Sequence, residues 1–145
     1  MTEQSETEYI CRIFIHRELK DLLDGYILNT NKEIEQCAML LGKGNKVLDI
    51  IFTENIDKSS VHFTISDKQL IETYQIAEEK QMDVIGIFHT HPFNVAWPSS
   101  TDKKYMKTNP VVWIIYSGIN KNLKAFILEG EEPLVVEIPI EESSK

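Results

Sequence analysis

The chain has 145 residues, of which 42% are hydrophobic, and a formal net charge of −8 at pH 7. This length suits a single domain, expected over residues 9–140, and the acidic balance disfavours nucleic acid as a partner, because phosphate binding requires clustered Lys and Arg. No apolar stretch reaches the roughly 18 residues of a spanning helix, and the acidic residues 1–8 are unlike a signal peptide. We therefore expect a cytoplasmic protein with no membrane partner, a disordered lead over residues 1–8 and a frayed tail over residues 141–145.

The first half of the chain is predicted to combine strands with one helix. Residues 9–15 form an apolar, β-branched run that predicts a strand. Residues 17–28 carry apolar side chains at helical spacing, which predicts an amphipathic helix covering the sheet. Residues 35–42 predict a strand that ends at a glycine-rich turn, and residues 46–53 its hairpin partner. The alternating pattern over residues 61–65 predicts a further short strand.

The second half is predicted to continue with helices and buried strands. Continuous apolar runs such as Val84–Phe88 are typical of strands buried on both faces. This succession indicates an α/β to α+β fold in which a mixed sheet is flanked by helices. In chain order, the expected elements are a helix capped by Ser66 that runs to about residue 81, a strand over residues 84–88, a helix over residues 99–109, and strands over residues 110–116, 123–128 and 134–138.

Two histidines, His89 and His91, follow the apolar strand within the sequence His-Thr-His-Pro. Side chains two apart on a strand share a face, so both imidazoles can bind one metal ion. Asp102, in the first turn of the helix expected from Ser99, is the candidate third ligand. Two His and one Asp leave the fourth tetrahedral position to water, as in catalytic zinc sites. A simpler alternative makes the histidines surface residues and Ser99 with Asp102 only a helix cap.

Two cysteines, Cys11 and Cys37, lie in predicted strands. Their spacing matches no metal-binding pattern, so we expect two buried free thiols. The sequence leaves open whether they pair with each other.

The motifs His89-Thr90-His91-Pro92, Trp97-Pro98-Ser99 and Asp102 resemble the JAMM signature of the MPN-domain metalloproteases. The resemblance extends over residues 10–138 and is closest to small stand-alone prokaryotic members of archaeal type. It implies the MPN/JAMM fold, a curved mixed sheet with flanking helices in a layout related to that of cytidine deaminases. It also implies one zinc ion, with a bound water, held by His89, His91 and Asp102.

The resemblance further assigns two catalytic residues. In the family, a Glu seven residues before a Gly serves as general base, and Glu35 and Gly42 have this spacing. Without the resemblance, Glu35 would be interpreted as an exposed strand end; Glu33 is a nearby rival that is out of register with Gly42. The hydroxyl of Ser99 is implied to stabilise the oxyanion. One departure, Ala38 where members commonly have Gly, adds a methyl group and removes no chemical group.

The implied activity is hydrolysis of the amide bond after the C-terminal glycine of a ubiquitin-like small modifier, whose conjugates would be the partners. An alternative is a processing protease that trims a sulfur-carrier precursor, and another is a non-catalytic MPN scaffold. All ligand positions are filled, which favours an enzyme over a scaffold. Phe93 and Trp97 are equally consistent with holding a substrate tail or with anchoring their own loop. The oligomeric state is left open.

Overall fold

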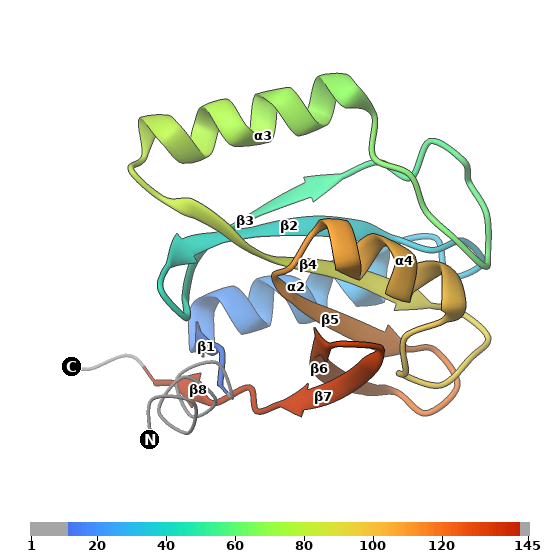
Figure 1. Cartoon of the computed structure of the whole chain (residues 1–145). Coiled ribbons are helices and arrows are strands. Elements are labelled where there is room, and N and C mark those ends of the chain that lie inside the picture. The colour runs from blue at the N-terminus through green and yellow to red at the C-terminus, as the bar shows by residue number, and fades with distance from the viewer. Residues whose placement is uncertain (1–11, 143–145) are drawn as a thin grey trace.

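The structure is a computed structural model that describes residues 12–142. Within this range, eight strands form one mixed sheet in the order β7-β6-β5-β4-β2-β3-β1-β8 (Figure 1). The strands are β1 (Phe14–His16), β2 (Cys37–Lys43), β3 (Lys46–Thr53), β4 (Asp83–His91), β5 (Val112–Ser117), β6 (Asn122–Glu129), β7 (Glu132–Val136) and β8 (Ile140–Glu141).

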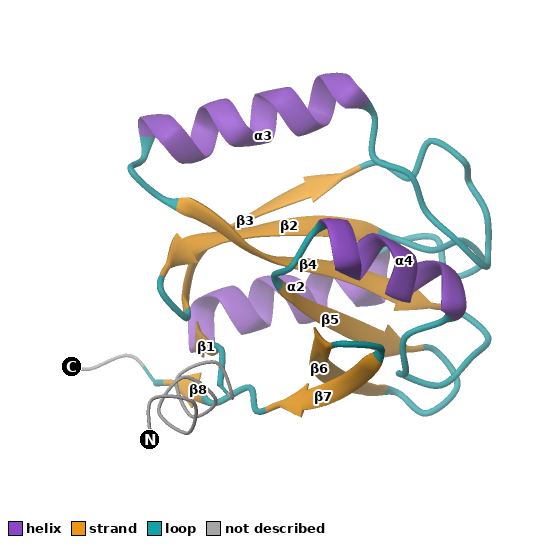
Figure 2. Ribbon diagram, viewed as in Figure 1, coloured by secondary structure: helices purple, strands orange, loops and turns teal. Residues whose placement is uncertain are grey.

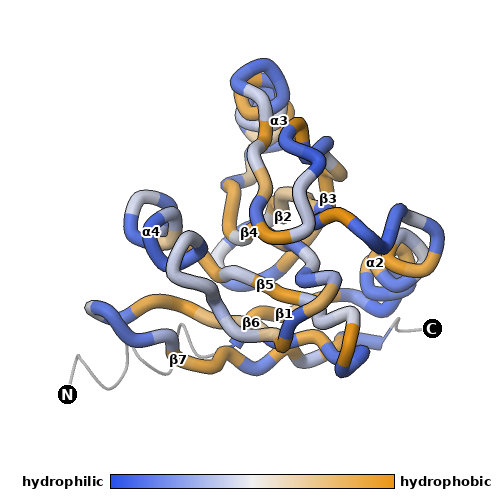
Figure 3. The backbone as a smooth tube through the Cα atoms, turned by 90° about the vertical axis from the view of Figure 1, so that its right-hand side faces the viewer, coloured by the Kyte–Doolittle hydropathy of each residue, from blue (hydrophilic) through white to orange (hydrophobic). Residues whose placement is uncertain are grey.

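Three helices flank this sheet: α2 (Arg17–Asn29), α3 (Asp67–Glu79) and α4 (Ser100–Thr108) (Figure 2). Both faces of the sheet are covered, as the side view in Figure 3 shows, with α2 on one side of the strands and α4 on the other. The result confirms the predicted α/β class and the mixed sheet flanked by helices. None of the helices described between residues 12 and 142 has the length and apolar character needed to cross a membrane.

Successive side chains along a strand point to opposite faces of the sheet, so they pack against different helices. Phe88 of β4 and Ile114 of β5 pack in the same cluster as Leu23 of α2. Their neighbours in sequence, Ile87 and Trp113, face the opposite way and pack with Met106 of α4. Strand β4 is therefore buried on both faces, which explains its uninterrupted apolar sequence.

Strand β4 is central to the sheet and extends through both histidines. It runs parallel to β5 and antiparallel to β2, with α4 forming the crossover between β4 and β5. The predicted strand over residues 84–88 is confirmed and is longer than expected at both ends. Because Ile87, His89 and His91 alternate along this strand, both imidazoles lie on the face that α4 covers.

The sheet curls so that its two edges approach each other. The chain leaves β7 at one edge and reaches the other edge, where the Ile13 N–H donates to the Glu137 carbonyl (2.8 Å) and the Ile15 N–H donates to the Pro139 carbonyl (3.1 Å). Strand β8 then pairs with β1 in parallel, which places Glu141 beside His16. Glu141 is thus part of a strand rather than of the expected frayed tail, whose residues 143–145 lie outside the described range.

The predicted strand over residues 61–65 is wrong. This segment belongs to a loop, residues 54–66, that connects β3 with α3 and that we call the site loop. Some of its main-chain groups bond within the loop: the Ile56 N–H donates to the Thr64 carbonyl (3.0 Å), and the Thr64 N–H donates to the side chain of Asn55 (3.1 Å). Residues 61–65 pair with none of the strands described between residues 12 and 142, so alternation alone was not sufficient to predict a strand.

Smaller differences concern the ends of the chain and the cysteines. The last predicted strand, residues 134–138, is shifted to Glu132–Val136. Of the first predicted strand, residues 9–15, the described part contains β1 at Phe14–His16, and residues 9–11 lie outside the described range. Cys37 is a buried free thiol, as expected. Cys11 and the lead over residues 1–8 lie outside the described range.

Candidate active site

Three side-chain atoms meet near the carboxyl end of β4. The Nε2 atoms of His89 and His91 are 3.1 Å apart, and Oδ2 of Asp102 lies 3.2 Å and 3.1 Å from them, respectively. In a tetrahedral zinc site with bonds of about 2.0–2.1 Å, two ligand atoms are separated by about 3.3–3.4 Å. The triangle formed by these atoms therefore has nearly the size of one face of a zinc tetrahedron.

The helix cap that the sequence also allows is present and aims Asp102 at the histidines. Ser99 is the N-cap of α4; its Oγ accepts a hydrogen bond from the Asp102 N–H (3.0 Å), and its own N–H donates to Asp102 Oδ2 (3.0 Å). The same oxygen atom is the one that faces His89 and His91. The cap and the metal-site interpretations are thus compatible, because the cap fixes the direction of the carboxylate.

The hydrogen bond on the far side of His91 sets its tautomer. Nδ1 of His91 lies 2.8 Å from the Val95 carbonyl oxygen, which can only accept, so Nδ1 carries the hydrogen. In the neutral ring the lone pair is then on Nε2, which faces His89 and Asp102. This is the arrangement in which an outer hydrogen bond orients a histidine ligand for a metal ion.

Aromatic rings enclose His89. The ring of Phe63, from the site loop, lies 4.8 Å from the His89 ring at an angle of 31°, and Trp113 meets it edge-on at 5.7 Å. His89 has no exposed surface. Its Nδ1 has no hydrogen-bond partner among residues 12–142.

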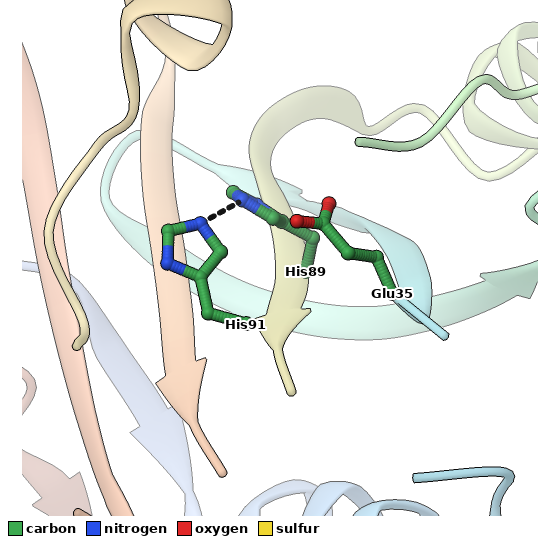
Figure 4. A group of neighbouring side chains, drawn as sticks. All are labelled: Glu35, His89 and His91. Carbon is green, nitrogen blue, oxygen red and sulfur yellow. Dashed lines mark hydrogen bonds between the residues drawn. The ribbon is translucent and has the colours of Figure 1, made fainter. Parts of the chain in front are cut away.

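Glu35 approaches the same point from the residues that precede β2. It is 2% exposed, and one of its carboxylate oxygens lies within 4.8 Å of a ring nitrogen of His89 and of His91 (Figure 4). Its Oε1 has no hydrogen-bond partner within the part of the chain that is described. A buried carboxylate oxygen without a partner is unfavourable, and a cation with its water would satisfy it. The residues present therefore fit a zinc ion. The rival Glu33 is exposed.

The pKa values of the two carboxyls of the site are shifted in opposite directions. Burial raises the pKa of Glu35 to about 8, against an opposing effect of His91. Burial also acts to raise the pKa of Asp102, but the positive charge that His89 can carry, the short contacts with His89 and His91, and the hydrogen bond from the Ser99 N–H hold that pKa well below its usual range. Burial lowers the pKa of His89. Such a division, with one carboxyl that stays ionised and one that can carry a proton near neutral pH, is typical of acid–base sites.

Glu35 gives the metal-free protein a pH dependence of stability with a defined sign. The pKa of its carboxyl rises from an ordinary 4.5 to about 8 on folding, so between these values the unfolded chain has lost a proton that the folded chain retains. The free energy of unfolding therefore falls as the pH rises through this window, by a few kcal/mol in all. We expect metal-free Glu35→Gln to melt near the wild-type temperature at about pH 4.5 and well above it beyond pH 8.

Thermal unfolding in chelator, followed by circular dichroism at several pH values, measures this difference. Glu33→Gln is the matched control, because it removes a neighbouring carboxylate that is exposed. A gap between wild type and Glu35→Gln that stays constant with pH would contradict a buried carboxyl that binds a proton more tightly in the folded state.

The loop between β4 and α4 contains the two aromatic residues for which the sequence left two roles open. Trp97 packs edge-on against Phe126 at 5.3 Å, which anchors the loop to the sheet. Phe93 is 65% exposed and lines a cavity of about 310 Å³ together with Tyr116 and Ile119. Trp97 thus has a structural contact, whereas Phe93 is available to a ligand.

Two residues next to the site did not emerge from the sequence. Phe63 covers His89, and the buried Asn55 donates a hydrogen bond to the main chain of Glu35 (3.0 Å). A local signal was available, since Asn55, Asp57 and Ser59 are turn-forming residues that indicate an ordered loop after β3. These turn-forming residues predict a loop, but they do not indicate that the loop contacts Glu35.

Known proteins resemble the chain in sequence and in fold. The family model for prokaryotic homologs of the JAB domain matches residues 26–128. A desampylase from Pyrococcus furiosus is 33% identical over 111 residues, which cover 77% of this chain and 78% of the desampylase. The solution structure of protein DSY2949 from Desulfitobacterium hafniense has a TM-score of 0.78 at 21% identity, covering 90% of this chain and 94% of that one. A solution structure from Salinibacter ruber has a TM-score of 0.65 at 23% identity, covering 88% and 91%. At these identities the two structures show the shared fold alone.

Proposed function

Because this chain belongs to the family of prokaryotic homologs of the JAB domain, and so to the JAMM group whose signature it carries, we propose that it is a zinc-dependent isopeptidase. The observation that carries the proposal is the triangle of His89, His91 and Asp102 with the buried Glu35 beside it. The similarity to a desampylase supports hydrolase activity. The proposed substrate is the amide bond that follows the C-terminal glycine of a ubiquitin-like small modifier.

His89, His91 and Asp102 would hold the zinc ion. When bound, the ion supplies a water molecule whose pKa is lowered from 15.7 to about 7, together with positive charge beside the oxygen of the substrate carbonyl. Two imidazoles and one carboxylate leave an open ligand position, which distinguishes a catalytic zinc site from a structural one. Asp102 remains ionised throughout, because its pKa lies well below its usual range.

Glu35 moves the proton. As general base it accepts a proton from the attacking water, and as general acid it delivers that proton to the departing amine. Its burial supports this role, because burial raises the proton affinity of a carboxyl. A cation at the site lowers that affinity again, so the group can both accept and release a proton near neutral pH.

Ser99 can donate to the oxyanion while it caps α4. Its Oγ accepts the Asp102 N–H, and a hydroxyl that accepts still has its own hydrogen available to donate. We propose that this hydrogen is donated to the oxygen that becomes negatively charged when the substrate carbonyl is attacked.

Ser99→Ala is expected to lower kcat by about 10²–10³, the usual effect of losing one oxyanion donor. The change also removes a helix cap, which costs roughly 0.5–2 kcal/mol of stability. Ser66→Ala is the matched control: Ser66, at the α3 end of the site loop, caps α3 by accepting the Gln69 N–H (3.1 Å), and its hydroxyl is not bonded to Asn55 or Glu35. Steady-state kinetics of both variants, with melting temperatures, separate the two roles. Equal kcat values for the two variants would leave Ser99 with its capping role alone.

Cleavage of an isopeptide-linked modifier conjugate, with and without chelator, tests the proposed function. A linear precursor with residues beyond the modifier's terminal glycine serves as a second substrate and tests the trimming alternative. Cleavage of the conjugate that stops on chelation is the expected result. A protein that binds no zinc and cleaves neither substrate would be a scaffold.

A further inference from the structure

Glu35 lies outside the strand pairing that fixes its neighbours. The pairing of β2 begins at Cys37, opposite His89 of β4 and Thr53 of β3. Glu35 precedes this point by two residues, so no ladder hydrogen bond of β2 holds its main chain. The next residue, Gln36, is bound to Thr90 of β4 through both of its main-chain groups (2.8 Å and 3.0 Å), but the main-chain groups of Glu35 itself bind another part of the protein.

The site loop supplies that support. The Glu35 N–H donates to the Ser59 carbonyl (2.8 Å), and the Glu35 carbonyl accepts a hydrogen bond from Nδ2 of Asn55 (3.0 Å). Both main-chain polar groups of Glu35 are thus bound to one loop. Asn55 is 2% exposed, so these bonds are shielded from water.

The amide of Asn55 connects the two sides of the loop. In addition to its bond to the Glu35 carbonyl, Nδ2 of Asn55 lies 3.0 Å from the carbonyl oxygen of His62 and 3.5 Å from the carbonyl oxygen of Ser59. Its Oδ1 accepts the N–H groups of Asp57 and Thr64, each at 3.1 Å. Every neighbour of Nδ2 is an acceptor and both neighbours of Oδ1 are donors, so only one orientation of the amide satisfies the set.

The same loop places Phe63 over the ligand His89. Phe63 lies between His62 and Thr64, whose main-chain groups both bind the Asn55 amide. Its ring then packs against His89 at 4.8 Å. One buried amide therefore holds both Glu35 and the ring that keeps water away from His89.

We infer that Asn55 is a positioning residue of the active site, which fixes Glu35 and Phe63 through four hydrogen bonds to main-chain groups, two donated by Nδ2 and two accepted by Oδ1. The inference rests on the proposed function, because it assigns the role of general base to Glu35. A base displaced by about 1 Å loses on the order of 10²-fold in rate. The zinc ligands come from β4 and α4, so loss of Asn55 leaves them in place.

Asn55→Ala tests the inference through two measurements. Hydrogen exchange of the Glu35 amide, which donates to the site loop, is expected to become at least about 10-fold faster, because local opening exposes it. The value of kcat is expected to fall by about 10–10²-fold with KM and zinc content nearly unchanged. Thr73→Ala is the control: Thr73 is buried in α3 and donates to the Gln69 carbonyl (2.7 Å), so its loss also weakens the fold without contacting Glu35.

Asn55→Asp is the second variant, in case the alanine variant does not fold. It keeps an oxygen for the Asp57 and Thr64 N–H groups and loses the Nδ2 donor, so it should also release Glu35. Unchanged exchange of the Glu35 amide, or a kcat loss that Thr73→Ala reproduces, would overturn the inference. If the wild type cleaves no conjugate, the proposed function fails, while the exchange rates still decide whether Asn55 holds Glu35.

Discussion

Glu35→Gln is expected to bind one zinc ion per chain and to lose about 10²–10⁴-fold in kcat, the usual contribution of a general base. Glutamine keeps the size of the side chain but cannot accept the proton. The proposed ligands His89, His91 and Asp102 are not altered, and their facing nitrogen and oxygen atoms lie 3.1–3.2 Å from one another without a contact to Glu35. Steady-state kinetics on an isopeptide-linked conjugate and elemental analysis of the purified variant measure the two quantities.

Glu33→Gln is the control for this experiment. Glu33 is two residues away and exposed, so its replacement removes the same charge from nearly the same position in the sequence. We expect wild-type kcat and zinc content for this variant. Full turnover by Glu35→Gln would remove Glu35 from the mechanism, and loss of zinc from it would make Glu35 a ligand rather than a base.

Removal of zinc is expected to abolish turnover and to leave the domain folded. The larger core cluster, which includes Phe88, Ile114 and Leu23, lies on the face of the sheet away from the site. Burial of this apolar surface does not depend on the ion. Turnover and the circular dichroism spectrum should be recorded before chelation, after it, and after one equivalent of zinc is returned; only turnover should change.

Two histidine variants sharpen this second prediction. His89→Ala removes a fully buried proposed ligand and should prevent recovery of activity by added zinc. His62→Ala is the control, because His62 lies in the site loop, half exposed, and pairs with Asp57 (3.1 Å) rather than with the site. Unfolding on chelation would mean that the zinc is structural and that the proposed roles are incorrect.

The sequence predicted those parts of the site that depend on local periodicity. The two-residue period of β4 places His89 and His91 on one face, and the cap at Ser99 places Asp102 in the first turn of α4. Both features follow from short stretches of sequence. The mixed sheet flanked by helices was predictable for the same reason, since most of its strands are continuous apolar runs.

The parts that the sequence did not predict depend on contacts between distant residues. The site loop owes its shape to the side chain of Asn55, which bonds Glu35 across 20 positions in sequence. An alternating pattern at residues 61–65 predicted a strand, because nothing local reveals that this segment pairs with none of the strands described between residues 12 and 142. Strand β8 is only two residues long and exists because β1 lies beside it.

Extended X-ray absorption fine structure at the zinc edge of the zinc-loaded protein tests the central claim most directly, because it reports the types of the atoms bound to zinc and their distances from it. His89, His91 and Asp102 with one water predict a first shell of nitrogen and oxygen atoms only, at about 2.0–2.1 Å, with the outer scattering of imidazole rings. A sulfur atom at about 2.3 Å, which would implicate a cysteine, or a shell without imidazole would contradict this account of the site.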